Sequence, residues 1–316
     1  MQKSILGNTG IEVSRLCFGS LTMSPLQAHL PVSKGADIIR YAFEKGINFL
    51  DTAELYDNYA YIAEALKFID RSKYVIATKS YSYSKETAEN SLYKALKEIN
   101  TDYIDIFLLH EQESEHTIRG HYEAIEFFLK AKEKGLIRAI GLSTHRIDAV
   151  VGSLKYDELQ VIHPIINKVG LGIQDGNVID MIEAIKAAYQ KGKGIYGMKP
   201  LGGGHLIKDV EEAMEFVKDI PFLHSIAIGM QCFEEVDANI NLVEHGYIPS
   251  DIKNKLGKKT RKLHIADWCL GCGKCTMVCR HGGIEIIDNK AVAVEGKCVL
   301  CGYCAAGCPE FCIKVI

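Results

Sequence analysis

Short apolar runs alternate with amphipathic stretches over residues 1–250 of the chain. Eight of the runs have the length and composition of buried strands: Leu16–Gly19, Asn48–Asp51, Tyr74–Thr78, Ile104–His110, Ala139–Ser143, Gln160–Ile166, Gly194–Lys199 and Ser225–Ile228. The clearest helical patterns lie between them, at Ser33–Lys45, Glu86–Ile99, His121–Lys134, Val178–Lys191 and Glu234–Glu244. Several of these patterns end in a glycine, as at Gly46 and Gly135, which is typical of a helix end.

A strand followed by a helix, repeated eight times, predicts a closed parallel (β/α)8 barrel, or TIM barrel. An open doubly wound sheet is the alternative. Such a sheet normally carries a Gly-x-Gly-x-x-Gly turn after its first strand, and none follows the first strand here. Ahead of that strand, Ile5–Val13 has Asn8-Thr9-Gly10 at its centre, which predicts a hairpin that caps the barrel floor.

Polar residues stand at the carboxyl ends of three neighbouring predicted strands, the end at which barrels carry their chemistry. Asp51 ends the second strand and Tyr56 follows it; Lys79 ends the third strand and His110 the fourth. A carbonyl reductase must protonate an alkoxide as it forms, and a nearby ammonium lowers the pKa of a phenol that does so. Tyr56 is then the acid and Lys79 the ammonium, held by Asp51, while His110 orients the carbonyl oxygen or relays a proton. Each residue alone has an ordinary structural explanation, so the prediction depends on their meeting at one mouth.

The end of the chain is dominated by cysteine. Eight of the 11 cysteines fall in two copies of a Cys-x2-Cys-x2-Cys-x3-Cys run, and each cysteine of the second copy lies 29 residues after its counterpart. In such pairs of runs, three thiolates bind one [4Fe-4S] cluster and the fourth binds the other cluster. The spacing predicts one cluster on Cys269, Cys272, Cys275 and Cys308, and a second on Cys298, Cys301, Cys304 and Cys279. A zinc site or a disulfide framework fits this pattern less well.

The repeat extends beyond the cysteines, because Gly273 returns as Gly302 and Ile284–Ile287 returns as Ile313–Ile316. Over about residues 266–316 the chain resembles the bacterial two-cluster ferredoxins. The resemblance implies a small α+β ferredoxin-like domain at 266–316, after a barrel at 1–250 and a basic linker at 251–265.

Composition adds limits on partners and location. The chain has 316 residues, 47% of them hydrophobic, and a net charge of −3, which is ordinary for a soluble protein and does not suggest a nucleic-acid partner. We expect no signal peptide and no membrane span, since no apolar run approaches the roughly 20 residues that cross a bilayer. Together with cysteine-ligated clusters, this predicts a cytoplasmic protein. The cations of residues 253–262 are interpreted as a solvated surface; docking of an acidic electron carrier, such as a ferredoxin or flavodoxin, is the sharper hypothesis.

The upstream residues resemble the aldo-keto reductase family over about residues 1–247. The segments that carry the resemblance are Asp51-Thr-Ala-Glu-Leu-Tyr56, Lys79, Leu108-Leu-His110, Gly141-Leu-Ser143, Pro200-Leu-Gly202 and Ile228-Gly229. The resemblance implies that Asp51, Tyr56, Lys79 and His110 form a catalytic tetrad, with Tyr56 as general acid–base. It also implies a nicotinamide cofactor, NAD or NADP, that donates hydride to an aldehyde or ketone. A subset of the family carries a C-terminal ferredoxin-like extension, and this chain looks like that subset.

The predicted cofactor contacts are Ser143, Asn167, Lys199, Leu201, Gly202, Gly229, Glu235 and Asn239. The first two would face the nicotinamide, the glycine-rich turn after Lys199 would approach a phosphate, and the last two would lie near the adenine. The chain departs from the family at His163, where a glutamine is usual, and at Met198, where an aromatic is usual. The segment 230–235 carries two carboxylates and no cation, so a strict NADP preference is not expected.

Two functions remain open at this level. The first is an oxidoreductase that interconverts a carbonyl and an alcohol with a nicotinamide, while two [4Fe-4S] clusters relay electrons. The alternative is an iron–sulfur electron-transfer protein whose barrel is a docking or sensing module without nicotinamide catalysis. The first requires nucleotide binding and a role for Tyr56 in turnover, whereas the second requires neither.

Overall fold

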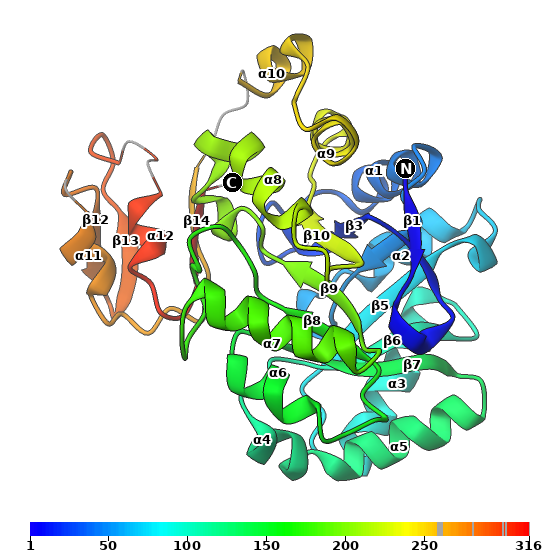
Figure 1. Cartoon of the computed structure of the whole chain (residues 1–316). Coiled ribbons are helices and arrows are strands. Elements are labelled where there is room, and N and C mark those ends of the chain that lie inside the picture. The colour runs from blue at the N-terminus through cyan, green and yellow to red at the C-terminus, as the bar shows by residue number, and fades with distance from the viewer. Residues whose placement is uncertain (258–261, 280, 299, 301, 316) are drawn as a thin grey trace.

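The computed structural model describes residues 1–316 except 258–261, 280, 299, 301 and 316. Eight parallel strands close into a barrel in the order β10-β3-β4-β5-β6-β7-β8-β9 (Figure 1). Their bounds are β3 (Leu16–Gly19), β4 (Phe49–Asp51), β5 (Val75–Ser80), β6 (Ile104–Leu109), β7 (Ile137–Thr144), β8 (Val161–Pro164), β9 (Gly194–Met198) and β10 (Ser225–Gly229). All eight predicted strands are confirmed, and their ends differ from the prediction by at most two residues.

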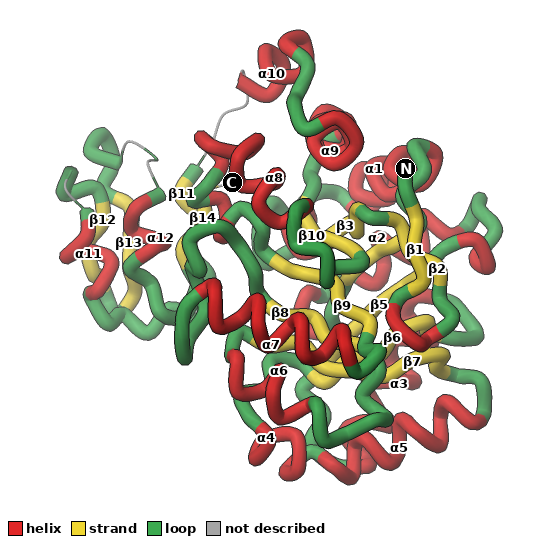
Figure 2. Tube along the Cα trace, viewed as in Figure 1, coloured by secondary structure: helices red, strands yellow, loops and turns green. Residues whose placement is uncertain are grey.

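Helices cover the outside of the barrel (Figure 2). They are α1 (Val32–Glu44), α2 (Tyr59–Leu66), α3 (Lys85–Ile99), α4 (Glu115–Gly120), α5 (Tyr122–Glu133), α6 (Ile147–Ser153), α7 (Val178–Gln190), α8 (Val210–Lys218), α9 (Phe233–His245) and α10 (Ser250–Gly257). The five predicted helices are α1, α3, α5, α7 and α9. The others are shorter, so their apolar periodicity is weaker. Within the described residues, no helix combines the length and apolar character needed to cross a bilayer.

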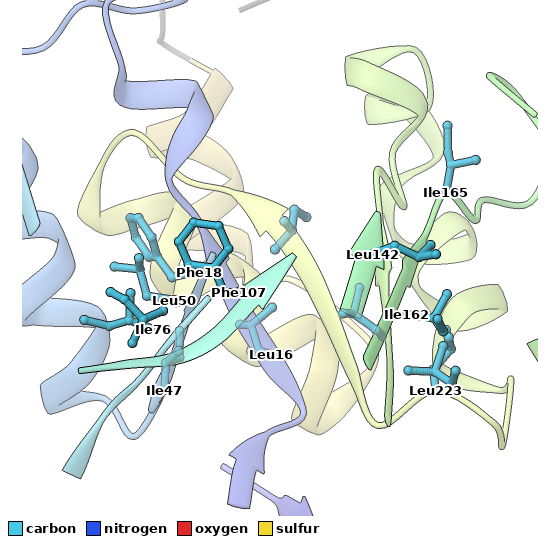
Figure 3. Close-up of a cluster of buried hydrophobic side chains, with 14 of the residues drawn as sticks. Leu16, Phe18, Ile47, Leu50, Ile76, Phe107, Leu142, Ile162, Ile165 and Leu223 are labelled. Carbon is cyan, nitrogen blue, oxygen red and sulfur yellow. The ribbon is translucent and has the colours of Figure 1, made fainter. Parts of the chain in front are cut away.

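Two layers of apolar side chains make up the barrel's core. Alternate residues of a strand face opposite sides, so Leu16, Phe18 and Leu50 point outward into the layer between strands and helices (Figure 3). Their neighbours Cys17 and Phe49 point inward and fill the barrel interior. This alternation fixes which polar residues point inward at the strand ends.

The predicted floor hairpin is confirmed. Strand β1 (Lys3–Ile5) pairs antiparallel with β2 (Glu12–Ser14). The buried side chains of Leu6, Ile11 and Val13 belong to the same cluster as the barrel interior. Gly7 is required in this connection, because its φ is 51° and a Cβ there would lie 2.3 Å from the backbone nitrogen of Gly194.

The described residues of the C-terminal region, 263–315, form two antiparallel strand pairs and two short helices. Strand β11 (Leu263–Ile265) pairs with β14 (Ile313–Val315), and β12 (Ile284–Ile287) pairs with β13 (Lys290–Ala293). Helices α11 (Lys274–Val278) and α12 (Tyr303–Ala306) each follow a glycine with positive φ, Gly273 and Gly302, which are the two glycines of the repeat. The region has its own apolar cluster and lies beside the barrel with the β11–β14 pair nearest to it (Figure 2). Part of the segment predicted as a linker, residues 251–265, instead forms most of α10 and strand β11.

Candidate active site

Strand alternation directs three of the predicted tetrad residues into the mouth of the barrel. Asp51 has the same parity as the inward-facing Phe49, Lys79 the same as Ala77, and His110 the same as Leu108. All three lie at the carboxyl ends of adjacent strands β4, β5 and β6, and each is at most 5% exposed. The fold therefore brings these residues together, as the sequence predicts.

Asp51 and Lys79 form a buried ion pair. The Lys79 Nζ lies 2.8 Å from Asp51 Oδ2 and 2.6 Å from the carbonyl oxygen of Thr52. The other carboxylate oxygen of Asp51 accepts a hydrogen bond from the hydroxyl of Tyr196 at 2.9 Å. A buried charge is tolerated when it is paired and hydrogen-bonded in this way, so the pair fixes both side chains at the base of the site.

Tyr56 stands at the end of the 3-10 turn η3 (Glu54–Tyr56), half-buried above the ion pair. The Lys79 Nζ lies 4.9 Å from the centre of its ring. Burial, followed by the charges of Asp51 and Glu111, raises the pKa of Tyr56 well above its usual value. The net shift of this pKa is thus opposite to the expected lowering, although Lys79 lies close enough to favour the phenolate. The ammonium is already engaged by Asp51 and the Thr52 carbonyl, and desolvation outweighs its effect.

His110 carries an unsatisfied buried nitrogen. Its Nδ1 has no hydrogen-bond partner among the described residues, although it is shielded from solvent. Its ring stacks on Tyr81 with centroids 4.5 Å apart and meets the edge of Tyr56 at 6.1 Å. Burial and then Lys79 lower the pKa of His110 well below 6.5, so its imidazole is neutral at physiological pH. A buried polar atom without a partner is costly, and a carbonyl or hydroxyl of a ligand would satisfy it.

His163 is a further member of this site, at the position noted for its departure from the family. Its Nδ1 lies 2.6 Å from the carbonyl oxygen of Tyr196, and the two rings stack with centroids 3.8 Å apart. Its Nε2 is 3.7 Å from Asp51 Oδ1. Burial lowers the pKa of His163 to about 4, so this ring is also neutral. The roles of His163 and Tyr196 toward Asp51 were not predicted, because they depend on contacts across the barrel interior.

A cavity of about 800 Å³ extends from this site across the barrel mouth. Asp51 and Tyr56 line one part of it. It is also lined by five of the predicted cofactor contacts, Lys199, Leu201, Gly229, Glu235 and Asn239. Its size suits an elongated ligand of cofactor dimensions.

Three predicted cofactor contacts do not line this cavity: Ser143, Asn167 and Gly202. The Ser143 hydroxyl accepts a hydrogen bond from the backbone of Glu111 at 3.0 Å. The Asn167 amide makes two hydrogen bonds to the backbone of Leu171, at 2.8 and 2.9 Å. Both side chains thus hold loops in this structure, and their contact with a nicotinamide stays a prediction.

The far part of the cavity carries negative charge near a helix start. Glu235 lies in the first turn of α9, and its carboxylate accepts a hydrogen bond at 2.7 Å from the backbone N–H of Gln231, which precedes the helix. Asn239, one turn further on, is buried against the cavity. The segment 230–235 therefore offers hydrogen-bond acceptors rather than a cation.

Three cysteines predicted to bind one cluster line a small cavity of the C-terminal region: Cys279, Cys298 and Cys304. The fourth, Cys301, lies outside the described residues. The Cys279 Sγ accepts a backbone N–H from Gly283 at 3.2 Å. Such N–H···S bonds stabilise thiolates and are found at iron–sulfur ligands.

Three cysteines of the other predicted ligand set lie in the apolar cluster of the C-terminal region: Cys275 and Cys308 are buried in it and Cys269 packs against it, whereas Cys272 is exposed. The Cys269 Sγ accepts a backbone N–H from Ala291 at 3.4 Å. Cys312 belongs to neither Cys-x2-Cys-x2-Cys-x3-Cys run, and its Sγ lies 3.3 Å from the Sγ of Cys308. Among the described residues no group of three or more potential ligands is spaced to hold a metal ion, so cluster binding stays a prediction.

Comparisons with known proteins match the barrel. Over 212 residues the chain is 28% identical to L-galactose dehydrogenase from Arabidopsis thaliana, covering 64% of this chain and 66% of that protein. Over 113 residues it is 34% identical to methylglyoxal reductase DkgB from Salmonella typhi, covering 34% of this chain and 42% of that protein. The matches thus span about two thirds or less of these curated relatives.

A solved structure shows the same fold. The holo form of the aldo-keto reductase AKR11C1 from Bacillus halodurans superimposes with a TM-score of 0.66 at 24% identity, covering 82% of this chain and 96% of that one. The model of the aldo/keto reductase family matches residues 15–253, which include the whole ring of strands and all four predicted tetrad residues. The chain therefore belongs to the aldo/keto reductase family.

Proposed function

We propose that this protein is an oxidoreductase that interconverts a small aldehyde or ketone and the corresponding alcohol, with Tyr56 as proton donor and acceptor. One observation carries the proposal. The buried Asp51–Lys79 pair lies directly below the half-buried Tyr56, beside a His110 whose Nδ1 lacks a partner within the described chain, at one part of a cavity of about 800 Å³.

A nicotinamide bound in this cavity would supply hydride to the carbonyl carbon. The chain's own residues handle the proton. Because the pKa of Tyr56 is raised, its phenol stays protonated at neutral pH and is able to donate to the oxygen of a carbonyl that is being reduced. The neutral His110 orients that oxygen, and Lys79 stabilises the phenolate that remains until solvent reprotonates it.

Asp51, Tyr56, Lys199, Leu201, Gly229, Glu235 and Asn239 would hold the cofactor along the cavity. We favour NAD over NADP, because the carboxylate of Glu235 and the amide of Asn239 suit ribose and adenine, whereas a 2′-phosphate would meet no cation in 230–235. Competing NADH against NADPH in equilibrium binding tests this choice.

Support for the substrate class comes from the relatives. Two of them are named L-galactose dehydrogenase and methylglyoxal reductase, and both names refer to the interconversion of a small carbonyl compound and an alcohol. The identity of the substrate is set by loops, so we extend only the class to this chain.

The C-terminal region would carry two [4Fe-4S] clusters, each able to exchange one electron. Cys269, Cys272, Cys275 and Cys308 would hold one, and Cys298, Cys301, Cys304 and Cys279 the other. The N–H···S bonds to Cys269 and Cys279 support thiolate ligation. Two clusters together match the two electrons of one hydride. A ferredoxin or flavodoxin in the cytoplasm is the proposed external electron carrier.

The experiment uses full-length protein purified without oxygen. Wild type, Tyr56→Phe and the matched control Tyr83→Phe, which alters an exposed tyrosine of a neighbouring loop, are assayed with NADH and a panel of small aldehydes. Loss of general acid catalysis predicts a rate about 100- to 10,000-fold lower in Tyr56→Phe alone, with unchanged iron content. If wild type binds neither nucleotide while its clusters transfer electrons to a carrier, the protein is an electron-transfer module and the proposal is wrong.

A further inference from the structure

The β11–β14 strand pair of the C-terminal region bridges two loops of the barrel mouth. On one side, the ring of His264 in β11 lies against the backbone of Leu26, in the loop after β3. On the other side, β14 contacts the glycine turn η5 (Gly202–Gly204) after β9, where a Cβ on Gly204 would come within 3.0 Å of the Val315 carbonyl oxygen. Strand β14 therefore borders the large cavity, which residues of both loops also line.

Strand alternation directs Lys314 toward the barrel. Ile313 is 1% exposed and belongs to the apolar cluster of the C-terminal region, so its neighbour Lys314 must face the other side of the strand. Lys314 lies opposite His264 in the register of the pair, and residues opposite each other share a face. Lys314 accordingly lines the large cavity, together with Thr22, Lys199 and Gly203 of the barrel.

Lys314 is a buried lysine that makes no ion pair within the described residues. It is 7% exposed, and its Nζ lies 5.6 Å over the ring of Trp268. The Glu111 carboxylate favours its charged form without forming an ion pair with it. Burial, followed by the charge of Lys199, lowers its pKa to about 7. Removing an ammonium from water is costly unless an opposite charge compensates.

Lys199 presents the same situation from the barrel side. Its Nζ lies 2.9 Å from His145 Nε2 and 4.5 Å over the ring of Phe311. Glu111 favours its charged form too, but no described carboxylate forms an ion pair with it. His145 cannot compensate the charge, because burial keeps that imidazole neutral by lowering its pKa well below 6.5. Two half-buried or buried cations thus line one cavity beside a glycine turn whose backbone can approach a ligand closely.

We propose that Lys314 and Lys199 together bind the diphosphate of a dinucleotide, so that the C-terminal region completes the cofactor site of the barrel. The inference rests on the proposed function for the identity of the dinucleotide, but the diphosphate site itself does not depend on catalysis. A diphosphate carries the two negative charges that these cations lack, and charge-assisted hydrogen bonds to phosphate are the strongest that lysine makes. The strand pair then acts as a strap over the middle of the cofactor.

The test measures binding of NADH and of inorganic diphosphate to full-length, cluster-loaded protein by calorimetry. Lys314→Met removes the charge and keeps the length of the side chain, and Lys290→Met makes the same change at an exposed site of the same region. Loss of one charged hydrogen bond predicts about 10- to 100-fold weaker binding of both ligands to Lys314→Met. Lys290→Met should bind both as wild type does, and both variants should keep their iron.

Each outcome separates the two proposals. If NADH binds wild type and Lys314→Met equally, the diphosphate site is wrong and the carbonyl reductase proposal stands. If diphosphate binding depends on Lys314 but neither NADH nor NADPH binds, the site is right and the proposed function is wrong. Should Lys314→Met fail to fold, amine acylation of wild type followed by mass spectrometry replaces it. Diphosphate should then protect Lys314 and leave Lys290 reactive, and equal labelling with and without diphosphate would refute the site.

Discussion

The substitution Lys79→Met probes the ion pair on which the site is built. Lys79 is 1% exposed and supplies Asp51 Oδ2 with its hydrogen bond at 2.8 Å, while Tyr196 supplies the other oxygen. The substitution leaves a buried carboxylate with a single donor and no opposite charge. Breaking one partner of a buried pair typically costs about 3–5 kcal/mol. We expect the free energy of unfolding of the barrel to fall by that amount, together with nearly all carbonyl reduction.

A second substitution separates stability from catalysis. Asp51→Asn in the Lys79→Met background removes the uncompensated charge and keeps the hydrogen bond from Tyr196, so most of the lost stability should return. Activity should not return, because the group that stabilises the phenolate of Tyr56 is still missing. Urea unfolding followed by far-UV circular dichroism in oxygen-free buffer measures stability. A loss below about 1 kcal/mol in the single variant, or a double variant no more stable than the single, would refute the buried-pair reasoning.

Three further predictions follow from the same structure. His163 has a pKa near 4 when folded and about 6.5 when unfolded, so the unfolded state takes up its proton first as the pH falls. Keeping His163 neutral in the folded state therefore contributes about 3 kcal/mol to the free energy of unfolding above pH 6.5, and this contribution is lost as the pH falls toward 4. His163→Gln should flatten the dependence of the unfolding free energy on pH over that window. Each [4Fe-4S] cluster holds four irons, so Cys308→Ser should reduce bound iron from about eight to about four per chain, whereas Cys312→Ser should keep all of it. Equal iron loss in the two variants would contradict the assignment of Cys308, and not Cys312, as a ligand. Phe311 is 8% exposed and packs on Gly172 of the barrel, so Phe311→Ala should weaken the packing of the C-terminal region on the barrel by about 3–5 kcal/mol. Amide hydrogen exchange in β14 should then become faster, and an unchanged exchange rate would contradict this prediction.

Much of the barrel follows from local patterns. The eight apolar runs predict the strands because a parallel strand covered on both sides must be apolar along its length. Once the strands are placed, their alternation alone directs Asp51, Lys79 and His110 to one mouth. The short helices α2, α4 and α6 escape prediction because their six to eight residues give too little periodicity to stand out.

The electrostatics of the site could not be predicted in the same way. The sequence shows that Lys79 is near Tyr56, but the sign of the effect on the phenol depends on burial and on the carboxylates of Asp51 and Glu111. The hydrogen bond from Tyr196 to Asp51 joins strands that are not neighbours in the barrel, so it depends on the closed geometry of the ring. Lys314 belongs to a three-residue strand, and only the docking of two separate parts of the chain places it beside Lys199.

The proposed reaction delivers a hydride from the nicotinamide to the carbonyl carbon and a proton from Tyr56 to the carbonyl oxygen. The most direct measurement incubates the oxygen-free protein with NADH deuterated at carbon 4 and a small aldehyde, and then locates deuterium in the alcohol by mass spectrometry. Wild type should place one deuterium on the former carbonyl carbon, and Tyr56→Phe should form almost none of this product. An alcohol formed without deuterium, or equal labelling by both proteins, would contradict the claim.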